Sequence, residues 1–374
     1  MSQKTRLLLV SVLAPILAFI ASLLIATIVI KISGNDPFKA YSRMLRYTKQ
    51  TDSITSILNR ASSLYIAGIA VALGFKMNLF NIGVEGQYRV AGLFAAYLGA
   101  QIHAPAVIHV TFIIAVAMIV GASYAGIAGY LRVKRNVNEV IATIMLNAIA
   151  EGLILWLINN HFRTQNQGGQ LGAKTARIDK SGWMPSLNRP FGWIGIHLPG
   201  GRDKLYGFVL VAVILGVVYH IVLTRTRFGF DLRASGGNAA AARASGVNPG
   251  RMILTTMLLS GAVAGLIGMP DLMGQTHFFD EAFPAGRGFD GIAVALLGQN
   301  HAVGVGVAAV LFGFLDRSSN ALQLVNVAPE VVAIMKGTIM ITAVITFVLL
   351  RRWATTSAVK TAARQIESAA VAAA

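Results

Sequence analysis

The stretch Phe75-Lys76-Met77-Asn78-Leu79-Phe80-Asn81-Ile82-Gly83-Val84-Glu85-Gly86-Gln87 constrains how the whole chain can fold. Apolar runs flank it at residues 66–73 and 90–98, and neither run reaches the about 20 residues that a membrane-spanning helix needs. A polar, glycine-broken segment is therefore expected at or near membrane depth. Such backbone is tolerated there only where it is buried in protein or lines a cavity. The stretch thus predicts a membrane protein with an interior polar site.

The composition places the rest of the chain in a membrane. Of its 374 residues, 55% are hydrophobic and only 13% are charged, whereas a soluble domain has about 25% charged residues. Several apolar stretches approach or exceed the length of a spanning helix. The absence of cysteine excludes disulfides, thiolate metal sites and thiol catalysis. We expect an all-α, polytopic integral membrane protein.

The formal net charge of +17 comes from basic residues dispersed between apolar segments. This distribution is typical of basic cytoplasmic loops of a membrane protein. Nucleic-acid binding would need a clustered basic surface, so no nucleic-acid partner is expected. The apolar part of residues 7–30 is too long for a signal peptide, which predicts an uncleaved first span.

The apolar segments predict about ten crossings. Full-length spans are expected at residues 7–30, 104–131, 140–158, 205–223, 252–274, 303–324 and 331–350. Shorter pairs of apolar segments lie within residues 62–98 and 258–297, and the second pair is broken at Gly268 and Pro270. Ten crossings result if both pairs cross the membrane, and the count falls toward eight if either pair is re-entrant.

The basic turns predict the orientation. Residues 132–135, 225–251 and 351–352 are expected in the cytoplasm, together with the N-terminus. Ten crossings satisfy all three turns. Residues 31–60 and 161–204 are then external, although they carry six and seven lysines and arginines.

Ten crossings divide into two sets of five. The first half is residues 1–160, residues 161–204 form an external loop, the second half is residues 205–350, and residues 351–374 are a cytoplasmic tail. An odd number of spans in each set inverts the second half relative to the first. Paired broken segments in inverted halves indicate a transporter site near the membrane midplane, so short broken helices are expected to meet there.

The opening stretch holds the first candidate residues. Asn81, Glu85 and Gln87 are predicted to line a polar passage, since ionisable residues inside a membrane are candidates for function. Glu85 and Arg89 stand four residues apart, so Glu85 has the alternative role of neutralising Arg89 on a helix. Lys76 is expected to extend toward an interface.

Two further polar segments could join this passage. In residues 286–291, Asp290 opens a short helix, where it either caps the helix or meets the opening stretch across the symmetry axis. Asn147 shares one side of a helix with Glu139 and Glu151, and hydrogen bonding between helices is favoured over ligand contact. The predicted pathway residues are Asn78, Asn81, Glu85, Gln87, Asn147, Phe289 and Asp290.

Residues 236–249 predict a short exposed helix in the cytoplasm. Asn238 can cap it, the alanines favour helix and Gly246 can end it. Such a helix suits docking into a groove on another protein, and an ordinary connector is the alternative.

Signatures of enzymes are missing from the sequence. There is no phosphate-binding loop of the G-x-x-x-x-G-K-[ST] type, no H-E-x-x-H and no G-x-S-x-G. His277, Asp280 and Glu281 are interpreted as a solvated loop rather than a metal site, and His301 as a loop or interface residue. No catalysis and no metal are expected in this chain.

Three motifs resemble a known family. FNIGVEGQ at residues 80–87, NEVIATIMLN at residues 138–147 and GFDGIAVALLG at residues 288–298 resemble permease subunits of bacterial ATP-binding-cassette (ABC) importers. The similarity is to the branch with simple-sugar, ribose and branched-chain amino-acid permeases, and within it to members linked to nucleoside uptake. It covers about residues 53–350.

The resemblance implies a multi-pass permease in the bacterial inner membrane that imports a nucleoside or a simple sugar. Its implied partners are two cytoplasmic ATPases, which hold the ATP and Mg²⁺, a second permease that is similar or identical, and an external solute-binding lipoprotein. This chain would hold no cofactor.

In the family, an E-A-A-x-x-x-G element docks on the ATPase. Residues 240–246 keep that spacing but have alanine for glutamate. The coupling residues that the resemblance implies are Asn238, Ala240, Ala241, Ala242, Arg243 and Gly246. Two alternatives are an ion-coupled secondary transporter, with Glu85 or Asp290 as the coupling carboxylate, and a non-transporting scaffold or receptor.

Overall fold

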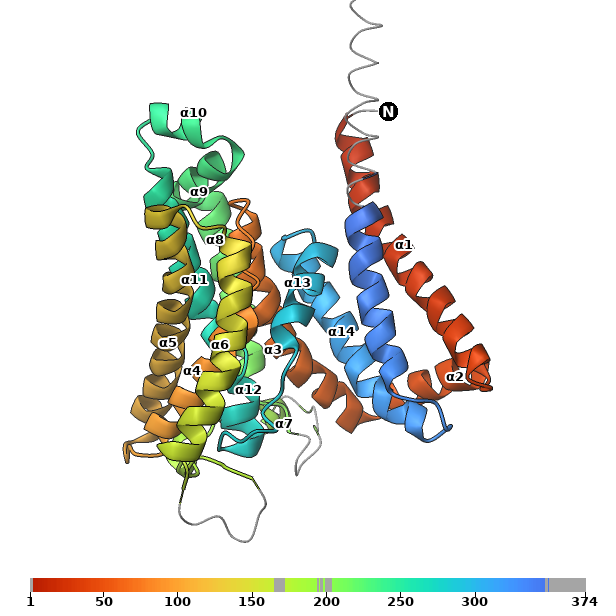
Figure 1. The fold of residues 1–374 in the computed structure, drawn as a ribbon. Helices are drawn as coiled ribbons and strands as arrows, with labels where there is room; N and C mark the ends of the chain where they lie inside the picture. The colour runs from red at the N-terminus through yellow and green to blue at the C-terminus, as the bar shows by residue number, and fades with distance from the viewer. Residues whose placement is uncertain are drawn as a thin grey trace, which may run out of the picture.

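The computed structural model describes residues 3–164, 172–193, 195, 198, 204–346 and 349. Within these residues the fold is a helical bundle, with no strand beyond two isolated bridges (Figure 1). The all-α prediction is therefore confirmed. The predicted cytoplasmic tail, with Arg351 and Arg352, lies outside the described residues.

Seven helices of the described part are long and apolar enough to cross a membrane. They are α1 (Gln3–Ile32), α3 (Thr51–Phe75), α5 (Ala106–Arg135), α6 (Glu139–Asn160), α8 (Phe208–Arg225), the Pro249–Thr276 segment that begins with α11 (Pro249–Gly265), and α14 (Ala302–Gln323). Residues 330–346 are also helical. The polytopic membrane class is thus confirmed, whereas the predicted count of about ten crossings is not.

Two of the ten predicted crossings are too short to span a bilayer. Helix α4 (Val84–Gly99) has 16 residues and α13 (Arg287–Leu297) has 11. At about 1.5 Å per residue, their lengths are about 24 and 17 Å, less than the about 30 Å of a hydrocarbon core. Both are half-helices that begin inside the bundle.

The predicted start of the first short pair is wrong. Helix α3 begins at Thr51 and is a full span of 25 residues, so only the residues before it belong to the loop predicted at residues 31–60. The hydropathy of α3 is low because its first half carries polar side chains that are buried against other helices. These are Ser53, Thr55, Asn59, Ser62 and Ser63.

The break predicted at Gly268 and Pro270 is present. Helix α11 ends at Gly265, and a turn leads into α12 (Met269–Asp271) and a π-helix, η3 (Leu272–Thr276). A Cβ atom at Gly268 would lie 2.6 Å from the Phe283 ring. A side chain at position 268 would clash with this ring, so glycine is required where the chain turns. Pro270 in α12 also disfavours the continuation of α11 as one long helix.

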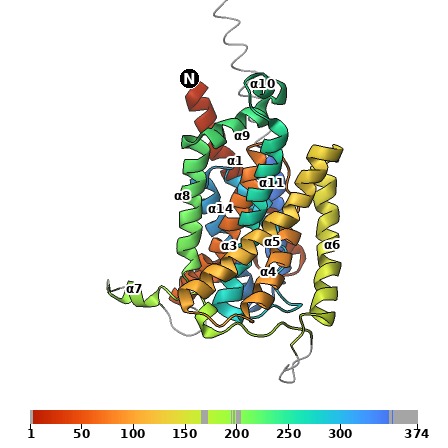
Figure 2. The ribbon, with the colours of Figure 1, turned by 90° about the vertical axis from the view of Figure 1, so that its left-hand side faces the viewer.

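The predicted orientation agrees with the arrangement of the loops. Helices α9 (Arg227–Gly237) and α10 (Ala239–Ala244) lie at one end of the bundle (Figures 1 and 2). There, Gly250 approaches Val133 in the basic last turn of α5. At the other end, Asn59 Nδ2 donates to the Lys204 carbonyl oxygen at 2.8 Å, and the surface helix α2 (Pro37–Thr48) lies near the start of α3. The two described basic segments predicted in the cytoplasm, residues 132–135 and 225–251, thus share one end, and the described parts of the loops predicted outside share the other.

Each half-helix packs against a long helix from the other part of the chain. Helix α3 packs against α13 and α14, and α11 packs against α4 and α5. In Figure 1, α3 rises toward the α9–α10 end, whereas α11 descends from it. Two inverted halves would produce this reciprocal packing. The division into residues 1–160 and 205–350 stays a prediction.

The external end contains a buried histidine with a pH-dependent contribution to stability. The His277 ring stacks on Trp183 with centroids 3.8 Å apart. Burial, and then the positive charge of Arg177, lower the His277 pKa from 6.5 to about 4. Between about pH 4 and pH 6.5, His277 therefore binds more protons in the unfolded chain than in the folded one. Its contribution to the free energy of unfolding is fully present above about pH 6.5 and is lost as the pH falls toward 4.

We expect the Tm of the purified protein to fall as the pH drops from 7 to 4.5. In His277→Phe, which keeps an aromatic ring against Trp183, the fall should be smaller. Thermal unfolding of both proteins across this pH range measures the difference. Equal pH dependence of the two Tm values would show that His277 does not contribute.

Candidate functional site

A polar cavity of about 600 Å³ lies between α3, the α12–α13 segment, α14 and the helix at residues 330–346. Among the described residues, its charged lining comprises Arg60, Asp271, Asp280, Arg287, Asp290, Asp316, Arg317 and Lys336. Four of these side chains are basic and four are acidic, so their formal charges cancel. Charged groups inside a membrane bundle are costly and indicate a substrate or ion pathway.

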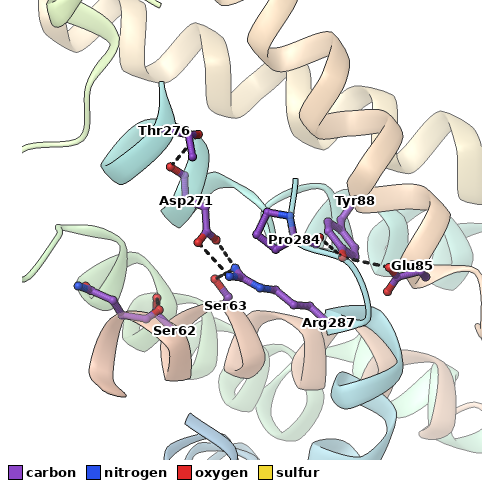
Figure 3. A network of polar contacts seen from close by, with 9 residues as sticks. Ser62, Ser63, Glu85, Tyr88, Asp271, Thr276, Pro284 and Arg287 are labelled. Carbon is purple, nitrogen blue, oxygen red and sulfur yellow. Dashed lines mark hydrogen bonds and ion pairs between the residues drawn. The ribbon is translucent and has the colours of Figure 1, made fainter. Parts of the chain in front are cut away.

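Arg287, the first residue of α13, connects three elements at the cavity. Its Nη2 donates to Asp271 Oδ1 at 2.9 Å, and its Nη1 contacts Asp271 Oδ2. The same Nη1 donates to Ser63 Oγ of α3 at 2.9 Å. Figure 3 shows the guanidinium reaching from α13 to the carboxylate of Asp271 at the helix break. This two-pronged contact fixes the start of α13 against α12 and α3.

Lys336 links α13 to two more elements of the cavity wall, α14 and the helix at residues 330–346. Its Nζ lies 2.6 Å from Asp290 Oδ2 of α13 and 2.6 Å from Asp316 Oδ1 of α14. The side chain of Asp290 therefore does not cap α13, whose N-cap residue is Gly286. The carboxylate is bound by Lys336 instead, although Asp290 still lies in the first turn of α13, where a negative charge offsets the helix dipole.

Glu85 does not pair with Arg89. The Arg89 Nη1 lies 3.4 Å from Glu151 Oε1 instead. The two carboxylate oxygens of Glu85 accept the N–H of Gly286 at 2.7 Å and the N–H of Gly288 at 2.9 Å. A carboxylate at the first turn of α4 thus binds the N-terminal N–H groups of α13, where the helix dipole favours negative charge.

The Glu85 contact brings the two sequence motifs together. Tyr88 supports it, since its hydroxyl is 3.1 Å from Glu85 Oε1 and donates to the Pro284 carbonyl oxygen at 2.7 Å (Figure 3). Glu85 contacts the second motif through the backbone N–H groups of Gly286 and Gly288 rather than through the side chain of Asp290. Gly288 has no room for a side chain, because a Cβ there would lie 2.5 Å from the Glu85 nitrogen.

Asn81 and Gln87 form a closed polar network behind α4. Asn81 Nδ2 donates to Gln87 Oε1 at 3.0 Å, and Gln87 Nε2 donates to Asn81 Oδ1 at 2.8 Å. Asn81 also donates to Ser260 Oγ at 2.9 Å, and Ser260 donates to the Ala70 carbonyl oxygen at 2.6 Å. The network holds the loop before α4 onto α11 and α3, away from the cavity.

Asn147 binds backbone on both sides of the α4 start. Its Oδ1 accepts the N–H of Gly86 at 2.9 Å, and its Nδ2 donates to the Ile82 carbonyl oxygen at 3.0 Å. Asn147 therefore forms hydrogen bonds between elements, which is the role that the sequence favours for it. Asn78 lies at the cytoplasmic end, where its Nδ2 donates to the Gly236 carbonyl oxygen at 2.7 Å.

Of the seven predicted pathway residues, only Asp290 lines the polar cavity in the described structure. Phe289 is 48% exposed and does not line it. The principal cavity charges absent from the predicted pathway set are Asp271, Arg287, Asp316, Arg317 and Lys336. A signal for the last three was present, since they interrupt apolar spans of the sequence.

The short cytoplasmic helix has its predicted caps. The Asn238 Oδ1 accepts the N–H of Ala240 at 3.0 Å and of Ala241 at 3.1 Å. Gly246 follows the end of α10 with a positive φ of 79°. Ala242 is buried, whereas Ala240, Ala241 and Arg243 are exposed. The helix presents small side chains on the surface, and its role in coupling stays a prediction.

The bundle, its broken helices and its charged interior cavity define a membrane transport protein. Residues 53–344 match the family described as the permease component of branched-chain amino acid transport systems, and the chain belongs to this family. No solved structure matches it.

Curated relatives cover nearly the whole chain. A guanosine ABC transporter permease protein of Bacillus subtilis is 34% identical over 86% of this chain and 90% of its own length. A glucose ABC transporter permease protein of Haloferax volcanii is 32% identical over 91% of this chain and 88% of its own. A nucleoside ABC transporter permease protein of Lactococcus lactis is 27% identical over 93% of this chain and 94% of its own.

The predicted resemblance to ABC importer permeases is therefore confirmed. The chain is a permease subunit and a multi-pass integral membrane protein, of the inner membrane in bacteria. Family membership implies a separate ATPase partner. It favours the importer over the ion-coupled alternative, and Glu85 and Asp290 are both engaged in contacts within the fold.

Proposed function

We propose that this permease carries a neutral, hydroxyl-bearing solute, a nucleoside or a simple sugar, into the cytoplasm. The observation that carries the proposal is the cavity of about 600 Å³ whose four basic and four acidic side chains balance. Its volume is in the range of small-molecule sites. A lining with balanced charge offers donors and acceptors to hydroxyl groups without favouring an ion. The names of the relatives, which include guanosine and glucose permeases, support the same solute classes.

The residues divide into two proposed roles. Asp290, with Arg287 and Lys336 beside it, contacts the solute in the cavity. Five predicted pathway residues act as supports, because their polar groups bond within the protein: Asn78, Asn81, Glu85, Gln87 and Asn147. Phe289 is 48% exposed on α13 and does not line the polar cavity, and no role is assigned to it.

The proposed assembly contains two permeases, similar or identical, and two cytoplasmic ATPases. An external solute-binding lipoprotein delivers the solute. The ATPases bind ATP and Mg²⁺, and this chain holds no cofactor. Helix α10, with its exposed alanines, transmits the motion of the ATPases to the spans.

Uptake into proteoliposomes tests the proposed function. The permease is reconstituted with its ATPase and binding protein, and guanosine, glucose, ribose and leucine are supplied as labelled solutes. We expect ATP-dependent uptake of a nucleoside or a sugar, insensitive to an uncoupler. Uptake of leucine alone would contradict the solute class. Uptake that needs no ATPase and collapses with an uncoupler would favour the ion-coupled transporter, and no uptake at all would favour a scaffold.

Substitution of Ala241 tests the coupling role of α10. Ala241→Trp places a large side chain on the exposed face of the helix, where docking requires small residues. We expect the solute moved per ATP hydrolysed to fall about tenfold, within the usual range of allosteric coupling. ATPase turnover and solute uptake in the same proteoliposomes give this ratio.

Ala106→Trp is the matched control, because Ala106 is exposed at the opposite end of the bundle, at the start of α5. It should leave the ratio unchanged. Unchanged coupling in Ala241→Trp, together with unchanged retention of the ATPase on pull-down, would remove α10 from the docking site.

A further inference from the structure

A second cavity, separate from the polar one, opens on the outer surface between α8 and α14. Its volume is about 510 Å³, and α3 contributes its floor. Helix α8 lies beside α3 and α14 (Figure 2). The walls are valines of the two outer helices: Val209, Val213, Val217, Val303 and Val310. We call this cavity the valine groove.

Small residues and a satisfied tyrosine make the valine groove apolar. The Tyr65 hydroxyl at the floor of the groove donates to the Ala302 carbonyl oxygen at 3.1 Å. Because the hydroxyl is bonded within the protein, only the apolar ring of Tyr65 is available to contact a ligand. Gly306 leaves the groove open, since a Cβ there would approach Tyr65 no closer than 3.5 Å. Val213 and Val303 are 56% and 71% exposed. The groove therefore accepts an apolar chain from outside the bundle.

The valine groove continues into a basic pocket at the cytoplasmic end. His220, His301 and Ala302 line both cavities. The basic pocket has a volume of about 320 Å³, and Lys76 and Arg233 lie in its wall. Lys76 follows the last residue of α3, and Arg233 belongs to α9. This end carries the basic turns and therefore faces the cytoplasm.

The basic pocket has no carboxylate partner within the described protein. No Asp or Glu is among its described lining residues. Neither Lys76 nor Arg233 forms an ion pair with a described carboxylate, and Arg233 Nη1 donates to the Leu223 carbonyl oxygen. Burial, and then the charge of Arg233, lower the Lys76 pKa. An anion between the two side chains would relieve this repulsion.

We propose that an anionic phospholipid of the cytoplasmic leaflet binds here, with its phosphate between Lys76 and Arg233 and one acyl chain in the valine groove. Basic pockets between membrane helices on this side suit anionic head groups. The groove follows α8 from Val209 to His220, about 17 Å at 1.5 Å per residue. Because Val209 is the second residue of α8, the groove extends past the midplane of the about 30 Å hydrocarbon core, and it is long enough to hold an acyl chain from the basic pocket through the whole cytoplasmic leaflet.

A second copy of the chain fits the same surface less well. In a two-fold interface each copy presents the same patch to the other. Docking through the valine groove would then bring a second Lys76 and Arg233 toward the first pair. Positive charge without a partner would double, whereas a phospholipid supplies the missing anion and the apolar chain together.

Native mass spectrometry of the purified full chain tests the head-group site. The probes are phosphatidylglycerol and phosphatidylcholine with identical acyl chains. We expect wild type to bind phosphatidylglycerol about tenfold more tightly, which corresponds to about 1.4 kcal/mol. Lys76→Gln/Arg233→Gln should lose this preference. The control Lys134→Gln/Arg135→Gln removes one exposed lysine and one exposed arginine at the same end and should keep it.

Gly306→Phe tests the groove, because its ring would occupy the space beside Tyr65. We expect it to weaken binding of both lipids, while the Tm shows that the variant is folded. The single variant Lys76→Gln serves where the double variant does not fold, and it should lower the preference.

Three results would overturn the proposal. One is equal binding of the two lipids by wild type, and another is a preference that survives both glutamine substitutions. The third is a Gly306→Phe variant that binds lipid as wild type does but loses permease dimerisation, which would assign the groove to a second copy.

Discussion

Glu85→Ala is expected to abolish solute uptake and to lower the stability of the permease. The carboxylate accepts the N–H groups of Gly286 and Gly288, and the Tyr88 hydroxyl lies 3.1 Å from Glu85 Oε1. Removing a buried charged acceptor leaves these donors without partners, which costs about 3–5 kcal/mol. The half-helices α4 and α13 are then no longer joined at their N-terminal ends, and the wall of the cavity loses its geometry.

Uptake in proteoliposomes and the Tm in detergent measure this effect. Glu85→Gln should be intermediate, since its amide keeps one acceptor oxygen but places an NH2 group against the second backbone N–H. The matched control is Glu330→Gln, because Glu330 is exposed and an exposed charge contributes about 0–1 kcal/mol. Wild-type uptake and Tm in Glu85→Ala would show that the joint between α4 and α13 is dispensable.

Arg287→Met is expected to have an effect of similar size through a different contact. The substitution keeps most of the apolar stem of the side chain but leaves the carboxylate of Asp271 buried without its partner. Breaking a buried pair by removing one member costs about 3–5 kcal/mol. Ser63 also loses its contact with the guanidinium. The Tm should fall, and uptake should fall with it.

The double variant Arg287→Met/Asp271→Asn separates structure from transport. Removing both charges should recover about 2 kcal/mol of the lost stability, because the two residues are coupled. Uptake should stay low, since the solute still lacks the donors of Arg287. Arg227→Gln is the control, because the Arg227 side chain is 94% exposed and its Nε lies 3.9 Å from Asp231 Oδ2. The loss of such an exposed pair should change the Tm little. Recovery of uptake together with the Tm would mean that Arg287 only supports the fold.

The sequence predicted the features that depend on local composition. Apolar length and the scarcity of charge identified a polytopic membrane protein, and Gly268 with Pro270 identified the break in the second half. The basic turns predicted which loops share an end. Asn238 and Gly246 predicted the caps of α10. Each of these depends on residues close together in the chain, where hydropathy, charge and backbone preference act directly.

The sequence was wrong where a polar side chain faces another helix. The buried Ser and Thr side chains of α3 lower its hydropathy, so its start at Thr51 was placed in an external loop. The spacing of four residues between Glu85 and Arg89 predicts an ion pair on one helix, as one of two alternatives for Glu85. The structure instead gives Glu85 the backbone of Gly286 and Gly288, about 200 residues away. Spacing describes neighbours on one helix only.

The sequence by itself therefore determined the class of protein, its broken helices and which of the described loops share an end. The tertiary structure alone decided which charges meet: Arg287 with Asp271, and Lys336 with Asp290 and Asp316. These partners come from different elements, and Lys336 reaches Asp290 across 46 residues of sequence. A buried charge requires an opposite charge, but which one it finds depends on how the helices pack.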